Sequence, residues 1–235
     1  MAGVQVAILT IAMKKILLVL ASMVPFMTLP VTAQEWSIGG ATGPFVFGKF
    51  ASRRLRAGTE QPGTEVTRVK LTAKTRPGLA ADIERRFNDR FALRLEGTFT
   101  RSPLAVTQEH GDSVSLDAGH INVTTLTLPL IIQINPHGTF RFHISGGPAY
   151  AIYRIHRTFT TGAQIAPFEG SRSRFGAAGG AGIEWWWSKK FGLQGDVVDI
   201  ATSSPFEKRD FVSPDSITIP RPHNVHTTIG VRYAF

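Results

Sequence analysis

The last eleven residues of the chain, Val225-His226-Thr227-Thr228-Ile229-Gly230-Val231-Arg232-Tyr233-Ala234-Phe235, alternate between two kinds of side chain. Apolar side chains stand at every odd position except Thr227, whereas the even positions carry polar or small residues. A period of two residues is typical of a β-strand with one apolar and one polar face. The stretch therefore predicts an amphipathic strand that ends on an aromatic residue.

Near the other end of the sequence, Met13-Lys14-Lys15 precedes an apolar run over 16–29. With Val31 and Ala33 at the minus-three and minus-one positions, the pattern predicts a secretory signal peptide over 1–33, cleaved after Ala33 and starting in effect at Met13. A membrane anchor would need about 20 apolar residues, and this run is shorter and contains Pro25. We expect an exported protein whose mature domain covers 34–235.

Composition narrows the kinds of partner and chemistry. The chain has no cysteine, which excludes a disulfide framework, a thiol nucleophile and a thiolate metal site. Removing Lys14 and Lys15 from the 26 basic residues leaves 24 against 17 acidic residues, a formal charge of +7. Such an excess favours a nucleic acid or an anionic surface. For an exported chain we expect anionic lipid and no nucleic acid.

Alternating runs recur through the mature sequence, with connections of two lengths between them. The predicted strands cover 36–48, 67–87, 91–103, 119–134, 139–155, 173–187, 191–202 and 225–235. The short connections lie at 88–90, 135–138 and 188–190, and the long ones at 49–66, 104–118, 156–172 and 203–224. Strict alternation of short turns and long loops is typical of outer-membrane barrels. The predicted fold is all-β, an eight-stranded antiparallel up-and-down transmembrane β-barrel.

The faces of the predicted strands indicate which side meets lipid. Leu, Ile, Val and Phe share one face, and ionised groups occupy the other, as in 91–100. A soluble barrel of this size would hold its apolar face inside. A sheet in a bilayer must also close, so that its backbone hydrogen bonds are satisfied internally. Aromatic residues near the short turns and the C-terminus predict an interfacial girdle: Phe87, Phe91, Phe140, Trp185, Trp187, Phe191, Tyr233 and Phe235.

The chain resembles the small outer-membrane β-barrel family, of the OmpX and OmpW type and the OmpA transmembrane domain. The features that carry the resemblance are the signal peptide, the alternating strands, Leu128-Pro129-Leu130 before a short turn, Gly146-Gly147-Pro148-Ala149 after it and the Tyr233-Ala234-Phe235 ending. The resemblance covers the whole mature chain. It implies a bacterial outer-membrane location. It also implies that the barrel assembly machinery reads Val231, Tyr233 and Phe235.

The inward positions predict an ion network in the lumen. Its members are Asp82, Glu84, Arg86, Arg94, Glu96, Arg141, His143, Glu184, Asp196 and Arg232. If Phe87 pairs with Phe91 across the turn, Glu84 lies opposite Arg94 as a cross-strand ion pair. An eight-stranded barrel is wide enough only for side chains. We therefore predict a salt-bridged plug, with an ion-conducting pathway as the alternative. The small residues of 176–182 are expected to make room for larger lumen side chains.

Catalytic and metal sites are poorly supported, and we predict neither, nor a cofactor site. His143 and Ser145 share a strand face with the spacing of a lipid A deacylase motif, but they point into the lumen and need a base and an orienting group. His110, His156 and His223 stand on different predicted loops without metal-ligand spacing.

The positive excess gathers at the outer ends of the predicted strands, at Arg68, Lys70, Lys74, Arg76, Arg101, Arg154 and Arg174. Arg101 and Arg154 fall on the outward face, at the height of lipid headgroups. They predict contacts with lipopolysaccharide phosphates, because guanidinium groups suit phosphate. Ordinary interfacial snorkelling is the alternative.

These observations predict a monomeric barrel with a structural or surface-interaction role: membrane integrity, adhesion, or recognition through the external loops. One alternative is a narrow channel or transporter for small or hydrophobic solutes. A lipid A-modifying enzyme is the third reading.

Overall fold

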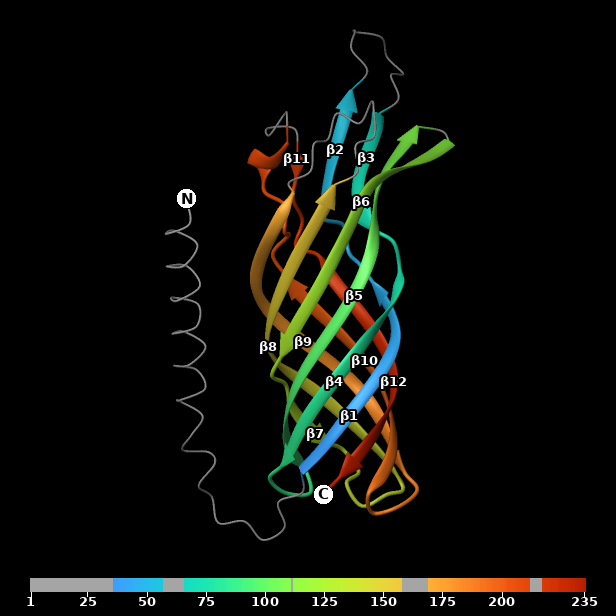
Figure 1. Ribbon diagram of the computed structural model, residues 1–235, viewed down its shortest axis with the longest axis vertical. Coiled ribbons are helices and arrows are strands. Elements are labelled where there is room, and N and C mark those ends of the chain that lie inside the picture. The colour runs from blue at the N-terminus through green and yellow to red at the C-terminus, as the bar shows by residue number, and fades with distance from the viewer. Residues whose placement is uncertain (1–35, 57–65, 111, 158–168, 212–216) are drawn as a thin grey trace. The chain divides into compact units, whose positions relative to one another are not determined.

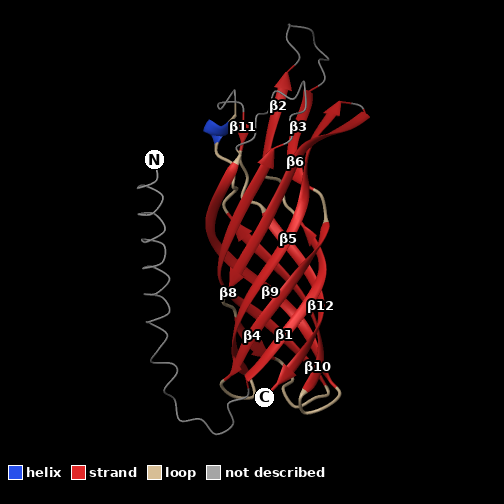
Figure 2. Ribbon diagram, viewed as in Figure 1, coloured by secondary structure: helices blue, strands red, loops and turns tan. Residues whose placement is uncertain are grey.

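The computed structural model describes residues 36–56, 66–110, 112–157, 169–211 and 217–235. The predicted signal peptide over 1–33 lies outside these residues. The strands are β1 (Trp36–Val46), β2 (Ala51–Arg56), β3 (Val66–Ala73), β4 (Arg76–Arg86), β5 (Phe91–His110), β6 (Asp112–Thr127), β7 (Leu130–Gln133), β8 (Phe140–Arg157), β9 (Gly170–Trp186), β10 (Phe191–Thr202), β11 (Ile217–Thr218) and β12 (His223–Ala234). Figure 2 shows strand in nearly all of this region, with a single 3-10 turn, η2 (Lys208–Asp210), in the described part.

The strands close into one antiparallel barrel (Figure 1). β1 pairs with β12 on one side and with β4 on the other, and the ladder continues through β5, β6 and β7, β8, β9 and β10 back to β12. Four barrel strands are interrupted, so β1 with β2, β3 with β4, β6 with β7, and β11 with β12 each count once. Within the described residues this gives eight strands, and the predicted fold is confirmed.

Proline explains one interruption and marks another. Pro129 has no amide hydrogen to donate, and it lies between β6 and β7, where its carbonyl accepts from the Arg94 amide. Pro77 follows the break between β3 and β4, and the Pro77 carbonyl accepts from the Thr100 side chain instead. The barrel therefore closes across these breaks with side-chain and single backbone hydrogen bonds.

The expected long loop over 104–118 is wrong. β5 and β6 continue as a paired hairpin through His110 and Asp112, with a register shift between Leu104 and Ala105. Such a bulge exchanges which alternate residues face inward. Leu104, Ala105 and Val106 are consecutive buried residues around it. The alternation therefore looks broken in the sequence although the strand continues.

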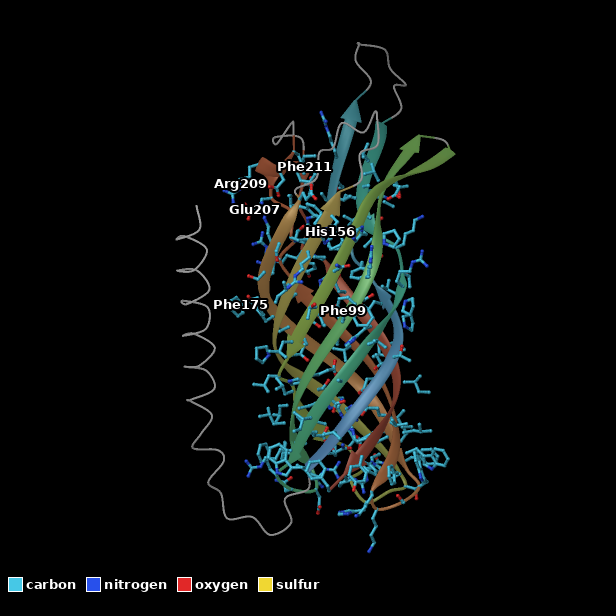
Figure 3. All side chains as sticks on the ribbon, viewed as in Figure 1. Phe99, His156, Phe175, Glu207, Arg209 and Phe211 are labelled. Carbon is cyan, nitrogen blue, oxygen red and sulfur yellow. The ribbon has the colours of Figure 1, made fainter. Side chains whose placement is uncertain are left out.

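The outward face carries a broad apolar band between two aromatic girdles. At the end with the short turns, the turn end, the rings of Phe140, Trp185, Trp187, Phe191, Tyr233 and Phe235 follow one another in contact. At the opposite side of the band, Tyr150 contacts Phe175, and Phe99 lies at the height of Phe175 (Figure 3). The sequence analysis missed this second girdle.

The two girdles have the spacing of a membrane. Phe140 and Tyr150 lie on β8, and ten residues at about 3.3 Å each and a tilt of about 40° span roughly 25 Å, the height of the lipid-facing band of such barrels. Within the band, large side chains such as Leu79, Phe142 and Ile229 are exposed. Among the described residues, no helix is long and apolar enough to cross a membrane.

Candidate functional site: a lumen in two layers

An ionic layer fills the lumen near the turn end, and Arg94 of β5 is one of its two centres. The Arg94 Nε donates to Glu84 Oε2 at 3.0 Å, and Arg94 Nη2 lies 2.9 Å from the same oxygen. Its Nη atoms also lie 3.5 Å from carboxylate oxygens of Glu184 and Asp196. Glu84 and Arg94 are directly opposite in the β4–β5 register. One guanidinium thus contacts carboxylates from three strands.

Arg232 of the terminal strand is the second centre. Its Nη2 donates to Asp82 Oδ1 at 2.5 Å, and its Nη1 lies 2.8 Å from Glu84 Oε2. Arg232 Nε donates to Gln194 and Nη1 to Ser37. Glu84 therefore contacts both arginines, and the barrel closure between β12 and β1 is tied to the same network.

The other predicted members lie around these centres. Arg86 Nη2 lies 3.7 Å from both Glu84 and Glu184. His143 Nε2 lies 2.8 Å from Asp196, and Arg141 lies over the Trp186 ring.

Glu96 lies apart from the arginine contacts. It is buried, and its Oε1 lies 3.7 Å from Nε2 of His226. The sequence analysis did not include His226, Gln194 or Ser37 among the site residues. For the first two, the inward phase of their strands was a sufficient signal.

Glycine leaves the space that these ionic side chains occupy. Gly182 of β9 is paired with His143 of β8 and Asp196 of β10. A Cβ at Gly182 would lie 2.3 Å from Asp196 Oδ1 and 2.7 Å from His143 Cε1. The small residues of 176–182 therefore include at least one position where a larger residue cannot fit without displacing the ionic layer.

An apolar layer fills the lumen toward the opposite end, the loop end. The sequence analysis expected a polar lumen and did not predict this layer. Its buried members include Phe45, Phe47, Phe50, Val69, Leu71, Leu104, Ile121, Val123, Tyr153 and Ile155. The Tyr153 hydroxyl is within 2.7 Å of Thr202 Oγ1 and accepts from Asn224, so the one phenol of the layer is satisfied.

The segment 203–211, which follows β10, covers the apolar layer, and we call it the latch. Its Phe206 ring lies 5.9 Å from that of Phe50 and 6.2 Å from that of Phe211. Both latch phenylalanines are buried. Ser204 donates from its hydroxyl to the Phe50 carbonyl at 2.9 Å. The loop thus supplies side chains to the core of the barrel.

Two arginines of β9 hold the latch. Arg172 forms a bidentate pair with Asp210, with Nη2 at 2.8 Å from Oδ1, and donates to the Pro205 carbonyl. Arg174 Nη2 donates to Glu207 Oε1 at 2.9 Å, and its Nε donates to the Ser204 carbonyl. Arg174 was expected at the outer end of its strand, and there it is half-buried and turned toward the latch.

These contacts shift the acids of the latch. The hydrogen bond from Arg174 holds the pKa of Glu207 below its ordinary value. Burial opposes ionisation of Asp210, yet the hydrogen bond from Arg172 and the backbone amide of Glu207 lower its pKa as well. Both carboxylates are therefore ionised at neutral pH when the latch is closed. Figure 3 shows Glu207 and Phe211 near the loop end.

The remaining predicted residues lie on the outer surface. Arg101 and Arg154 are exposed on β5 and β8, with Asn122 of β6 paired to each of them. Val231 and Phe235 are exposed on the terminal strand, and Tyr233 between them is half-buried against the Phe191 ring.

Histidines do not assemble a metal site in the described residues. His156 stacks on His120, and His223 Nδ1 lies 2.7 Å from Asp199. The side chain of His110 lies outside the described residues. His143 is buried in the ionic layer, and Ser145 follows it on the same face.

Solved structures of several outer-membrane proteins are similar to this chain. The outer membrane protein OprG from Pseudomonas aeruginosa is similar, with a TM-score of 0.60 and 17% identity over 86% of this chain and 96% of that one. The attachment invasion locus protein Ail of Yersinia pestis matches at a TM-score of 0.43 and 16% identity, over 87% of this chain and 100% of that one. Neisserial surface protein A matches at a TM-score of 0.46 and 11% identity, over 86% of this chain and 97% of that one.

No protein-family model and no curated protein sequence matches the chain. The chain thus has the fold of the small outer-membrane β-barrels, as the sequence analysis predicted. At sequence identities this low, the similarity shows the fold alone, and the function has to be argued from the site.

Proposed function

We propose that the chain is exported with cleavage after Ala33 and acts in the bacterial outer membrane as a non-conducting barrel with a structural or surface-interaction role. The role is membrane integrity, adhesion or recognition through the parts beyond the loop-end girdle. The apolar band between the girdles supports the membrane placement, because so large an exposed apolar surface is otherwise covered by a partner. Heat-modifiable gel mobility in the outer-membrane fraction tests it, and a soluble periplasmic protein would contradict it.

The two-layer filling of the lumen carries the proposal that the barrel does not conduct. A water-filled path would have to cross the ionic layer, where Arg94 and Arg232 are both about 2% exposed or less. It would then have to cross the apolar layer, which offers permeating ions little to replace their water. The same lumen groups thus act as a plug in this proposal.

Conductance in planar bilayers tests the plug. We expect no reproducible single-channel steps from the wild-type barrel. Arg86→Gln and the exposed-turn variant Arg90→Gln form a matched pair, because only Arg86 contacts lumen carboxylates. Regular steps in the wild type whose size changes in Arg86→Gln and stays constant in Arg90→Gln would overturn the proposal.

The partners we propose are outer-membrane lipid, lipopolysaccharide phosphates at Arg101 and Arg154, and the barrel assembly machinery. The outward face of the terminal strand supports the last of these, because Val231 and Phe235 are exposed on the strand that closes the barrel against β1. Phe235→Ala should lower the folded fraction in the outer membrane severalfold. Thr227→Ala, on the same outward face, should leave it unchanged.

A second candidate is a route for small hydrophobic solutes into the loop end. The observation that favours it is that Phe206 and Phe211, which fill part of the apolar layer, belong to the latch and not to the wall. A withdrawn latch would leave an apolar surface of matching chemistry. Binding of a lipophilic dye only in the double variant Arg172→Gln/Arg174→Gln would support this candidate.

For the enzyme reading, the lumen position of His143 and Ser145 argues against access by a lipid substrate. We propose that the chain is not an enzyme. Lipid A mass spectra from cells with and without the protein test this, and a change in acylation would contradict it.

A further inference from the structure

A cationic patch lies directly beyond the loop-end girdle on the outward face. Arg101 follows the girdle residue Phe99 by two residues on β5, and Arg154 follows Tyr150 by four on β8. At about 3.3 Å per residue and a tilt of about 40°, these guanidinium-bearing positions lie roughly 5 and 10 Å beyond the girdle. Figure 3 places His156 beyond Phe99 and Phe175 in the same direction.

Three neighbouring strands bring four side chains together in this patch. Arg101 Nη2 lies 3.2 Å from Nε2 of His120 on β6. The His120 ring stacks on that of His156 on β8, with centroids 4.7 Å apart and planes 17° from parallel. The two histidines are register partners, and Arg154 lies two residues before His156 on the same face. A single surface therefore presents two guanidinium and two imidazole groups.

The contact with Arg101 decides the protonation of His120. A guanidinium only donates, so His120 Nε2 accepts from Arg101 and that ring is neutral in this arrangement. Asp117 is the described carboxylate that acts electrostatically on His120, and its Oδ1 accepts from the Gly119 amide. The two guanidinium groups thus give the patch more hydrogen-bond donors than acceptors.

This chemistry fits an anion and not a metal ion. Stacked histidines on adjacent strands could each offer a nitrogen, but Arg101 occupies His120 Nε2 and Arg154 adds a second positive charge. A phosphate offers several acceptor oxygens and negative charge, which arginine matches in a fork and which favours protonated imidazole.

We propose that Arg101, His120, Arg154 and His156 form one binding site for a phosphomonoester, and that a lipid A phosphate of the outer leaflet occupies it. The lipid source follows from the position of the site next to the aromatic girdle, within reach of a headgroup whose acyl chains cover the apolar band. This inference rests on the proposed outer-membrane placement. It adds the histidine pair to the predicted arginine contacts and defines a single site in place of a diffuse collar.

Lipid A retained by the purified barrel, counted by native mass spectrometry, tests the proposal. We expect one bisphosphorylated lipid A per wild-type barrel and at least tenfold weaker retention in Arg101→Gln/His156→Gln. His223→Gln is the matched control, since His223 is an exposed outward histidine paired with Asp199 away from the patch. Equal retention in all three proteins would overturn the site.

A second measurement needs no variant. Dephosphorylated lipid A should bind at least tenfold more weakly to the wild type, and only the phosphorylated form should shift the His120 and His156 Cε1–H NMR signals toward protonated imidazole. Inorganic phosphate that shifts both signals while lipid A does not would overturn the lipid source. Cell fractionation is scored separately, so a failed site and a failed outer-membrane placement remain distinguishable.

Discussion

The two layers of the lumen solve the same packing problem with opposite chemistry. Near the turn end, side chains from β4, β5, β9, β10 and β12 meet as ions and amides. Near the loop end, aromatic and aliphatic side chains meet, and part of that core comes from the latch. The wall changes little between them, since the same strands run through both layers.

The difference shows what each layer demands of the chain. Buried charges must be paired with good geometry, because desolvation otherwise outweighs their attraction. Wall side chains with glycine opposite them can meet this demand. An apolar layer needs only area and close packing. A flexible connection can therefore contribute to the apolar layer and cannot easily contribute to the ionic one.

The largest expected effect comes from breaking the ionic layer. Arg94→Leu leaves Glu84 with one arginine fewer and removes a cation that contacts both Glu184 and Asp196, so we expect a loss of about 3–5 kcal/mol in the free energy of unfolding. Urea unfolding of the barrel in detergent, followed by tryptophan fluorescence, measures it. Arg90→Leu, at an exposed turn, is the control and should change little.

A double-mutant cycle then separates pairing from burial. Glu84→Gln/Arg94→Gln should lose less than the two single variants together, because each single variant leaves the other member of the pair buried with one opposite charge fewer. Additive losses would contradict the description of these two residues as a pair.

In the apolar layer, the expected loss is somewhat smaller. Leu71→Ala removes a fully buried side chain and leaves a cavity, which we expect to cost about 2–4 kcal/mol in the same unfolding assay. Leu79→Ala is the matched control, since Leu79 is 64% exposed on the outward face. The control should lose less than half as much, and equal losses would mean that the apolar layer is not a packed core.

Loosening the latch should act locally. Arg172→Gln removes the bidentate contact with Asp210, so trypsin cleavage after Lys208 and Arg209 should become about tenfold faster, equivalent to about 1.4 kcal/mol of local opening. The global unfolding free energy should change much less. Arg154→Gln, which is outward and exposed, should be cleaved like the wild type. Unchanged cleavage in Arg172→Gln would mean that the phenylalanines alone hold the latch.

Acid should produce the smallest effect of this series, and we expect to measure it in the latch. Because the pKa values of Glu207 and Asp210 are lowered in the closed latch, their stabilisation is complete above the unfolded values of about 4 and disappears as pH falls through the folded ones. Pepsin cleavage near Phe206 and Phe211 should therefore rise between pH 4 and pH 2, relative to the unfolded chain. A flat ratio would contradict the carboxylate contribution.

The sequence predicts the wall far better than the contents of the lumen. Alternation along 91–100 was sufficient to place Arg94 and Glu96 inward, because a two-residue period fixes the face of every residue in a regular strand. It failed at Leu104 and Ala105, where the bulge shifts the phase and the inward face turns apolar. The prediction assumed that the inward face is polar throughout. A strand whose inward face becomes apolar was therefore predicted as a loop.

Contacts that depend on loop conformation could not be predicted. Nothing near Phe206 in the sequence indicates that its ring reaches Phe50, about 150 positions away, or that Glu207 is the partner of Arg174. The stacking of His120 on His156 required the register of β6 against β8. His156 was placed in the predicted loop 156–172, whereas β8 continues to Arg157.

The β5–β6 hairpin has a consequence for any partner at the surface. Its strands stay paired as far as Glu109 with Ser113 and His110 with Asp112, beyond the cationic patch (Figure 1). A flexible loop of that length would lose conformational entropy each time it bound, whereas a ribbon already held by its own hydrogen bonds loses much less. The chain thus carries a preorganised projection. Its β5 edge is covered by β3 as far as Glu109, whereas its β6 edge before Gly119 has no second strand partner among the described residues and offers backbone groups to an extended segment of another molecule.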